Sequence, residues 1–276
     1  MKHLKTPMDI LKVLDRSNCR ECGEPTCLAF AAAVFKGKRS LDECPRLDPQ
    51  LLEEYAADAT IGRNNEEDME DAAAGLRNRV SAVDLASAAV RLGGRFSGDR
   101  LTIKVCGKDV HVDTRGKVTS GIHVHPWLVI PLLTYVLEGE GRPVSGNWVP
   151  FRELRGGGPW QGLFEQRCEK PLKKVADLYT DLFEDMLHVF NGKRVDNLFD
   201  SDISIVLYPL PRVPILFCYW KPEDGMESSL NMFFDVTAEK NLTIDGTYAL
   251  ITGLVRMFEK VAQRHGVPSW ASKRQN

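Results

Sequence analysis

Four cysteines near the start of the chain have the spacing of metal ligands. Cys19, Cys22 and Cys27 are separated by two and then four residues, and Cys44 follows after sixteen more and directly precedes Pro45. A cysteine-ligated iron–sulfur cubane takes four thiolates, and the closely spaced ones usually come from one tight loop. The pattern therefore predicts that Cys19, Cys22, Cys27 and Cys44 bind a 4Fe-4S cluster.

The residues between these cysteines suit such a loop. Gly23 tolerates a positive φ and Pro25 fixes a bend, so neither side chain obstructs a metal core. Thr26 is a typical N-cap, which predicts a helix that begins near Cys27. The positive end of that helix dipole stabilises anionic thiolates and sulfides.

Zinc and disulfides are the other possible uses of these cysteines. A structural zinc site usually pairs two C-x2-C knuckles, whereas only Cys19 and Cys22 form one here. Disulfides need an oxidising compartment, and no N-terminal signal to one is expected. The spacing favours a cluster over zinc, and zinc over disulfides.

The segment from Met8 to Pro45 reads MDILKVLDRSNCRECGEPTCLAFAAAVFKGKRSLDECP. It resembles the 4Fe-4S domain at the start of the large subunit of the corrinoid iron–sulfur protein, and a module in the B subunit of the Rnf electron-transport complex. The similarity covers the four cysteines, the glycine after the second, the alanine-rich helix with Gly37 at its end, and the Cys-Pro ending. It implies a low-potential 4Fe-4S cluster, a role in anaerobic metabolism, and the four ligands Cys19, Cys22, Cys27 and Cys44.

Composition indicates an ordinary soluble protein. Hydrophobic residues make up 43% and charged residues 27% of 276 residues. The formal net charge of -2 does not indicate nucleic-acid binding. The longest apolar runs, such as Trp127 to Leu133, are far shorter than the roughly 20 residues that span a bilayer. We expect a cytoplasmic protein with neither a nucleic-acid nor a membrane partner.

The stretch from Thr60 to Asp68 is polar and has no periodicity, which is typical of a linker. We therefore expect an iron–sulfur module over residues 1–60 and a second domain over residues 61–276. The predicted fold class is α+β: a small helical module, followed by an antiparallel-sheet domain with packed helices.

Hydrophobic periodicity predicts the elements of the second domain. Apolar residues at helical spacing predict helices, and period-two alternation around Gly107 predicts an antiparallel meander. The prolines near position 211 restrict their strand to a sheet edge or produce a bulge. The expected helices cover residues 70–92, 126–137, 172–190 and 244–264, and the expected strands cover 100–105, 110–113, 203–208, 213–220 and 230–236.

Residues 210–242 read LPRVPILFCYWKPEDGMESSLNMFFDVTAEKNL and resemble the uncharacterised family DUF3786. The resemblance extends roughly from Val83 to His265 and implies no established activity. Four side chains could carry chemistry. The two acids have no base, nucleophile or metal partner nearby in the sequence, and the two histidines, which could ligate a metal or handle protons, lack further ligand spacing and are more often a polar edge, so no reaction class follows. The four side chains are Asp224, Asp235, His123 and His125.

Single-electron transfer, or reductive activation of a low-potential partner, is the expected function. By analogy with the related modules, the redox partner is expected to be a corrinoid protein or another metalloenzyme. Two alternatives stay open: a cluster-containing enzyme with a substrate pocket in the second domain, and a structural or sensing cluster in a partner-binding protein. Ligation by cysteine alone leaves no open position for a substrate, which favours an accessory protein over an enzyme.

Overall fold

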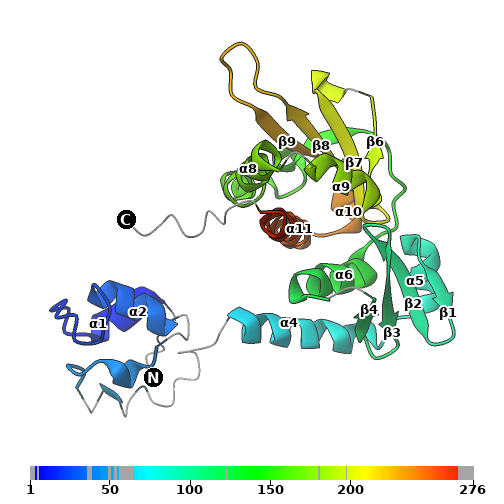
Figure 1. The fold of residues 1–276 in the computed structure, drawn as a ribbon. Helices are drawn as coiled ribbons and strands as arrows, with labels where there is room; N and C mark the ends of the chain where they lie inside the picture. The colour runs from blue at the N-terminus through cyan, green and yellow to red at the C-terminus, as the bar shows by residue number, and fades with distance from the viewer. Residues whose placement is uncertain are drawn as a thin grey trace. The chain divides into compact units, whose positions relative to one another are not determined.

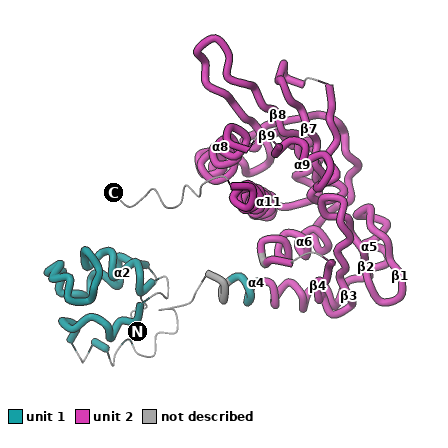
Figure 2. The backbone as a smooth tube through the Cα atoms, in the orientation of Figure 1, with its two compact units in different colours: residues 1–72 teal, residues 73–276 magenta. Residues whose placement is uncertain are grey.

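The computed structural model describes residues 4, 6–35, 39–48, 51–52, 55, 65–121, 124–179, 181–196 and 198–266. The chain divides into two compact units, residues 1–72 and 73–276 (Figure 2). Each unit has its own buried apolar cluster. The expected boundary between residues 60 and 61 lies outside the described residues and stays a prediction.

Short helices form the N-terminal unit (Figure 1). Helix α1 (Pro7–Val13) begins at an N-cap, because the Thr6 hydroxyl oxygen accepts a hydrogen bond from the Asp9 amide at 3.2 Å. Helix α2 (Cys27–Phe35) packs against α1, and η1 (Leu41–Glu43) follows. The buried core consists of Leu4, Ile10, Leu14, Cys27, Phe30, Ala31, Val34, Leu41, Cys44, Leu47 and Tyr55. The expected helix end at Gly37 lies outside the described residues.

Two helices are present where the sequence predicts one, and the first of them begins before residue 73. Helices α4 (Asn65–Val80) and α5 (Leu85–Leu92) are separated by a turn. Asp84 explains the break, because its carboxylate accepts a hydrogen bond from the Ala86 amide at 3.0 Å and caps α5. Aspartate favours helix starts over helix interiors. The single helix predicted over residues 70–92 is therefore wrong.

A four-stranded antiparallel meander follows, as predicted. Its strands pair in sequence order, and in the two long central strands alternate side chains are buried. Helix α5 packs against β2. The strands are β1 (Arg95–Ser97), β2 (Arg100–Val105), β3 (Lys108–Asp113) and β4 (Val118–Ser120).

A five-stranded antiparallel sheet forms the rest of the domain, in the order β5-β9-β8-β7-β6. Central strand β8 is buried along nearly its whole length, which explains its continuous apolar run. The pairing of β7 with β8 shifts register between Leu207 and Leu210, so the proline-rich stretch produces a bulge. The strands are β5 (Trp148–Pro150), β6 (Lys193–Arg194), β7 (Ile203–Leu210), β8 (Val213–Trp220) and β9 (Ser229–Asp235).

Helices cover the second sheet. Helix α6 (Pro126–Glu138) begins as predicted at Pro126, and α11 (Ile244–Arg264) has the predicted bounds. Helix α11 packs against α6 and α8, and α8 packs against β9 (Figure 1). The remaining elements are η2 (Phe151–Glu153), η3 (Gly158–Trp160), α7 (Gln161–Phe164), a π-helix (Glu165–Glu169), α8 (Lys170–Leu178), α9 (Leu182–His188), η5 (Leu198–Asp200) and α10 (Ala238–Asn241).

The apolar stripe from Leu172 to Phe190 is buried, but the single helix predicted there is wrong. The chain is extended at Tyr179 (φ -119°, ψ 92°), which ends α8. The Tyr179 hydroxyl donates to Asp185 at 2.6 Å, and its ring stacks on His265 with centroids 5.2 Å apart. These contacts outside α8 hold Tyr179 out of a continuous helix.

Within the described part of the chain, no helix combines the length and the apolar character needed to cross a bilayer.

Candidate metal centre

The loop that carries Cys19 has an unusual backbone. Arg16, Asn18 and Arg20 have φ values of 60°, 52° and 63°, whereas the residues between them are not in this region. Each such residue costs about 1–2 kcal/mol unless it is glycine. The amides of this loop donate to separate acceptors: the Ser17 amide to Asp15 Oδ1 at 2.9 Å and the Asn18 amide to Cys27 Sγ at 3.3 Å. Between α1 and α2, the backbone is thus held in an uncommon conformation around Cys19.

Cys27 is fixed to this loop from both sides. The Asn18 amide donates to Cys27 Sγ at 3.3 Å, and the Cys27 amide donates to Asn18 Oδ1 at 2.8 Å. Cys27 is the first residue of α2, and Thr26 caps that helix by accepting from the Ala29 amide at 3.0 Å, as predicted. The Cys27 sulfur therefore receives an N–H hydrogen bond at the positive end of a helix.

Cys44 follows η1, and its buried side chain lies in the same apolar cluster as Cys27. Burial raises the pKa of the Cys44 thiol, and the negative charges of Cys22, Asp15 and Cys27 raise it further. Electrostatic repulsion of this kind acts between groups that are near one another. The three cysteines also belong to the same apolar cluster. The fold thus brings Cys22, Cys27 and Cys44 together from segments far apart in sequence.

The four cysteines differ in exposure. Cys27 and Cys44 are each 8% exposed, whereas Cys19 and Cys22 are half-buried. A group held by all four would have one side against the core of the module and another side closer to solvent. The solvent-facing side would carry Cys19 and Cys22.

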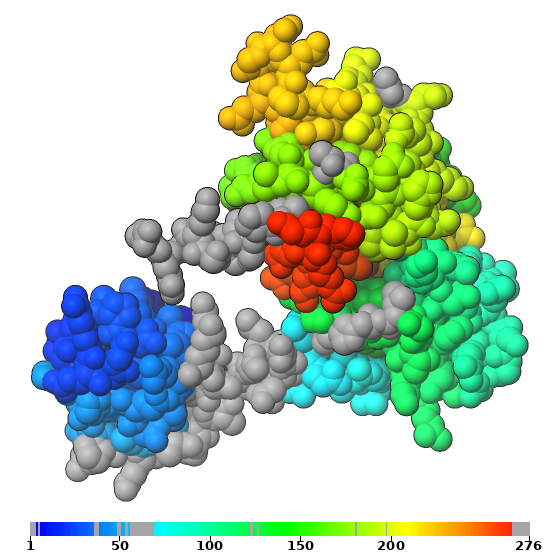
Figure 3. All heavy atoms as spheres, viewed as in Figure 1, coloured from blue at the N-terminus to red at the C-terminus, as the bar shows by residue number. Residues whose placement is uncertain are grey.

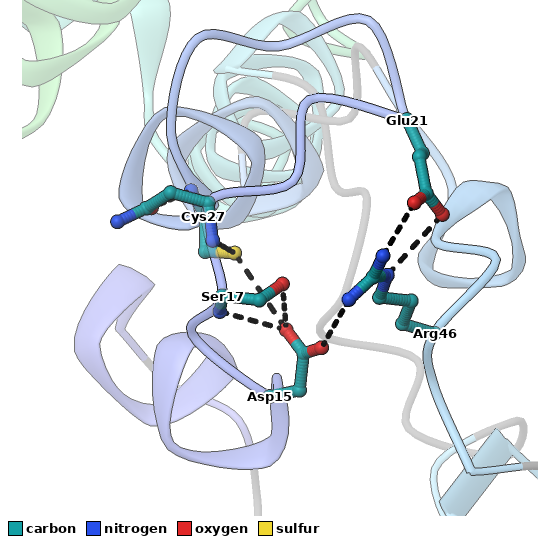
Figure 4. Close-up of polar contacts among 6 residues, drawn as sticks. Asp15, Ser17, Glu21, Cys27 and Arg46 are labelled. Carbon is teal, nitrogen blue, oxygen red and sulfur yellow. Dashed lines mark hydrogen bonds and ion pairs between the residues drawn. The ribbon is translucent and has the colours of Figure 1, made fainter.

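Polar side chains connect the cysteine segments (Figure 4). Asp15 Oδ1 accepts from the amide and hydroxyl of Ser17 at 2.9 and 2.8 Å, and it lies 4.0 Å from Cys27 Sγ. The Arg46 guanidinium lies between the carboxylates of Asp15 and Glu21. The contacts of Asp15 with Ser17 and of Arg46 with Asp15 and Glu21 join these segments without a cysteine side chain.

The donor set fits an iron–sulfur group. Four free thiols, one of which accepts an N–H hydrogen bond at the start of a helix, are what an anionic cluster requires. Among the residues that the structure describes, no three His, Cys, Asp or Glu side chains are arranged to hold a metal ion. A four-iron cluster is larger than one ion, so its thiolates need not converge on one point.

A cavity of about 700 Å³ opens in the C-terminal unit between α8, α9, β7, β8 and the β8–β9 hairpin. Figure 3 shows this hairpin projecting from the surface near α8. Asp177 on its wall accepts hydrogen bonds from Ser228 Oγ at 2.6 Å, Tyr219 Oη at 2.9 Å and Lys173 Nζ at 3.0 Å. Burial acts to raise the pKa of Asp177, but these hydrogen bonds outweigh it and lower the pKa.

The candidate acids from the sequence do not line this cavity. Asp224 is exposed in the β8–β9 hairpin, and Asp235 is fully buried. The Asp235 carboxylate accepts from the amides of Gly146 and Thr237 at 2.6 and 2.9 Å, so it anchors the segment before β5.

Of the two candidate histidines, His123 lies outside the described residues. His125 Nδ1 accepts from the Trp127 amide at 3.2 Å and caps α6. Among the described candidates, Asp224, Asp235 and His125 thus lie on three different elements, the β8–β9 hairpin, β9 and the start of α6.

Two features of the N-terminal site were missed from the sequence. Asn18 could have been noticed, because asparagine tolerates a positive φ better than most residues and directly precedes Cys19. No local sequence pattern indicates that Arg46 pairs with Glu21, because 25 positions separate the two residues.

Comparison with known proteins divides the chain in the same way. Residues 84–257 match a family described as "Domain of unknown function (DUF3786)". The chain belongs to the DUF3786 family. Ahead of the DUF3786 domain, residues 14–46 match a family described as "Putative Fe-S cluster". Both resemblances stated from the sequence are confirmed.

Curated relatives of this DUF3786 protein match its N-terminal part. The corrinoid/iron-sulfur protein large subunit of Moorella thermoacetica is 48% identical over 54 residues, which are 20% of this chain and 12% of that protein. The acetyl-CoA decarbonylase/synthase complex subunit gamma of Methanocaldococcus jannaschii is 41% identical over 46 residues, or 17% and 9% of the two chains. The chain thus spans about a tenth of the length of these relatives. No solved structure matches it.

These matches support an iron–sulfur cofactor in the N-terminal module, and they make the protein an iron–sulfur cluster-binding member of the DUF3786 family.

Proposed function

We propose that this protein binds a 4Fe-4S cluster through the thiolates of Cys19, Cys22, Cys27 and Cys44 and passes single electrons to a partner protein. The observation that supports this most is the strained loop around Cys19, in which Arg16, Asn18 and Arg20 have positive φ and the Asn18 amide donates to Cys27 Sγ at 3.3 Å. A strained backbone of this kind persists where the surrounding structure and function require it.

A bound 4Fe-4S cluster supplies a one-electron couple, which takes one electron from a low-potential reductant and gives it to one acceptor. The chain's own residues determine how the cluster is held. Cys27 and Cys44 are buried and shield one side from water, and the half-buried Cys19 and Cys22 leave the other side accessible. Electrons therefore enter and leave on the side of Cys19 and Cys22.

The partner is a protein that holds a low-potential centre, such as a corrinoid protein or another metalloenzyme. The names of the relatives support a protein partner, because they describe subunits of larger assemblies. Three further cysteines, Cys106, Cys168 and Cys218, are free and buried. Free thiols suit the reducing cytoplasm, where we place this protein.

Metal analysis of anaerobically purified full-length protein tests the proposal. We expect about four irons and four acid-labile sulfides per chain, and an EPR signal that appears after reduction with dithionite. Zinc without sulfide would overturn the electron-transfer function and leave a structural knuckle. A cluster that dithionite cannot reduce would indicate a structural or sensing role.

Single substitutions identify the ligands. We expect Cys19→Ala, Cys22→Ala, Cys27→Ala and Cys44→Ala to lower the iron content, because each removes one thiolate. Cys218→Ala is the matched control, since this buried thiol lies in the other unit. Full iron and sulfide content in any of the four variants would contradict that ligand assignment.

A further inference from the structure

Arg46 lies two residues after Cys44 and forms a bidentate ion pair with Glu21. Its Nη2 donates to Glu21 Oε1 at 2.6 Å, and its Nε donates to Glu21 Oε2 at 3.2 Å. Its Nη1 lies 3.9 Å from Asp15 Oδ2 (Figure 4). Paired N–H donors on one carboxylate fix both distance and orientation, which a lysine cannot do.

The partners of Arg46 belong to the segments that carry the other three cysteines. Glu21 lies between Cys19 and Cys22 in the sequence. Asp15 contacts Cys27, since its Oδ1 lies 4.0 Å from Cys27 Sγ. One guanidinium therefore connects the Cys44 segment to the segments of all the other thiols.

The charge of Arg46 also acts on the thiols. The pKa of Arg46 is raised, first by the hydrogen bond to Glu21 and then by the charges of Glu21 and Cys19. The geometry places this charge beside the thiols, because Arg46 contacts Glu21 of the Cys19–Cys22 loop and lies 3.9 Å from Asp15, whose other oxygen is 4.0 Å from Cys27 Sγ. Reduction adds negative charge to a cluster, and a nearby cation stabilises the reduced form more than the oxidised form.

Arg39 offers a matched comparison in the same segment. Its Nη1 forms an equally short ion pair with Glu43 Oε2 at 2.6 Å, and its side chain is 37% exposed against 45% for Arg46. That pair joins residues four apart, whereas the more distant contact to Glu24 is 3.8 Å long. Arg39 therefore carries the same charge and also faces the cysteine loop, but it forms no bidentate hydrogen bonds with a carboxylate of that loop.

We propose that Arg46 is a positioning residue for the cluster, holding the Cys44 segment on the Cys19–Cys22 loop, and that its charge raises the reduction potential. The inference rests on the proposed function, because it needs a cluster at the four cysteines. The Arg46 side chain thus makes two separate contributions. Its bidentate pair with Glu21 determines how firmly the cluster is retained, and its charge affects the reduction potential of the cluster.

EPR-monitored redox titration of full-length, cluster-loaded protein measures the charge effect. In Arg46→Gln, we expect the oxidised-to-reduced ratio at a fixed ambient potential to rise about three- to tenfold, where tenfold equals 59 mV for one electron. Glu21→Gln should shift the midpoint in the opposite direction, since it removes a negative charge beside the same thiols. Arg39→Gln should shift it less than Arg46→Gln does.

Arg46→Lys separates charge from geometry. We expect its midpoint to stay near that of the wild type, while its cluster is lost several-fold faster on exposure to an iron chelator. A purely structural role predicts equal cluster loss in Arg46→Lys and Arg46→Gln, with no opposite shifts in potential.

The outcomes distinguish this inference from the proposed function. A wild-type protein without iron and sulfide removes the proposed function itself. A normal wild-type cluster whose midpoint is the same in Arg46→Gln, Glu21→Gln and Arg39→Gln overturns only the role of Arg46. If Arg46→Gln holds no cluster, the midpoint shift in Glu21→Gln tests the charge effect, and the rate of cluster loss to the chelator in Arg46→Lys tests the positioning role.

Discussion

Asn18 combines two properties that few residues share. It adopts a left-handed backbone with φ 52°, and its side chain accepts the hydrogen bond from the first amide of α2. Asparagine visits this region more readily than most residues because its short polar side chain can form local hydrogen bonds. The residue therefore fixes the loop around Cys19 and the start of the Cys27 helix at once.

Two substitutions separate these properties. Asn18→Gly keeps the backbone conformation and loses the acceptor, so we expect the module to lose about 1 kcal/mol of unfolding free energy. Asn18→Ala also adds backbone strain of about 1 kcal/mol. The urea concentration at which the visible absorbance of the cluster disappears should fall in the order wild type, Gly, Ala. Equal midpoints in all three proteins would refute this role.

Buried thiols in the DUF3786 domain predict a loss of stability in alkaline solution. Burial raises the pKa of both Cys106 and Cys168 from 9.0 to about 12. The thiols therefore ionise first in the unfolded chain, so their contribution is complete below pH 9 and is lost as the pH rises towards 12. At pH 10, ionisation of each thiol in the unfolded chain should lower the free energy of unfolding by about 1.4 kcal/mol.

Urea unfolding at pH 8 and pH 10, followed by tryptophan fluorescence, checks this expectation. All five tryptophans lie beyond residue 72, so the signal reports on the C-terminal unit alone. Other groups also titrate in this range, and Cys168→Ala isolates one thiol. Its stability loss between the two pH values should be smaller than that of the wild type by about 1.4 kcal/mol; an identical loss would contradict the effect.

At the scale of elements, the linker between α6 and β5 is held against α5. Arg91 on α5 donates from its guanidinium to the carbonyl oxygens of Gly139 and, at 3.0 Å, Val136. Gly141 and Gly146 in this linker both have positive φ, at 75° and 81°. A Cβ atom at Gly141 would meet the backbone of Arg91, whereas a Cβ atom at Gly146 would meet nothing within 4 Å.

The two glycines form a matched pair of variants. Gly146→Ala should cost only the backbone strain, about 1–2 kcal/mol. Gly141→Ala should cost roughly 1–3 kcal/mol more, because the linker or α5 must move to relieve the clash. Urea unfolding monitored by tryptophan fluorescence measures both. Equal losses would show that the close approach of the linker to α5 does not contribute to stability.

At the scale of the whole molecule, the two units have separate cores. The cluster of apolar residues around Phe30 and Val34 lies entirely within residues 4–55, and the cluster around Phe217 and Phe258 begins at Ala73. Separate cores predict separate unfolding transitions.

Loss of the iron–sulfur group should therefore leave the DUF3786 domain intact. We expect Cys27→Ala to lower the far-ultraviolet helical signal of the module and to leave the urea midpoint of tryptophan fluorescence unchanged. The control is Gly141→Ala, which should lower that midpoint and leave the iron content unchanged. A shift of the tryptophan midpoint in Cys27→Ala would show that the two units unfold together.

Sequence alone determined features that depend on neighbouring residues. The N-cap at Thr26 and the bounds of α11 were both predicted, because capping and helical periodicity act over a few positions. The alternation in β2 and β3 predicted their pairing for the same reason. The cysteine spacing predicted the cluster ligands, which stay a prediction.

Tertiary structure decided what depends on residues far apart in the chain. Asp235 anchors Ser145 across 90 positions, and Arg46 pairs with Glu21 across 25, so no local pattern reveals either contact. The apolar stripe from Leu172 to Phe190 was correctly predicted to be buried, but the break at Tyr179 follows from contacts with Asp185 and His265. Spacing reports which residues can face a core, whereas the partner that each residue meets there is decided only when the whole chain packs.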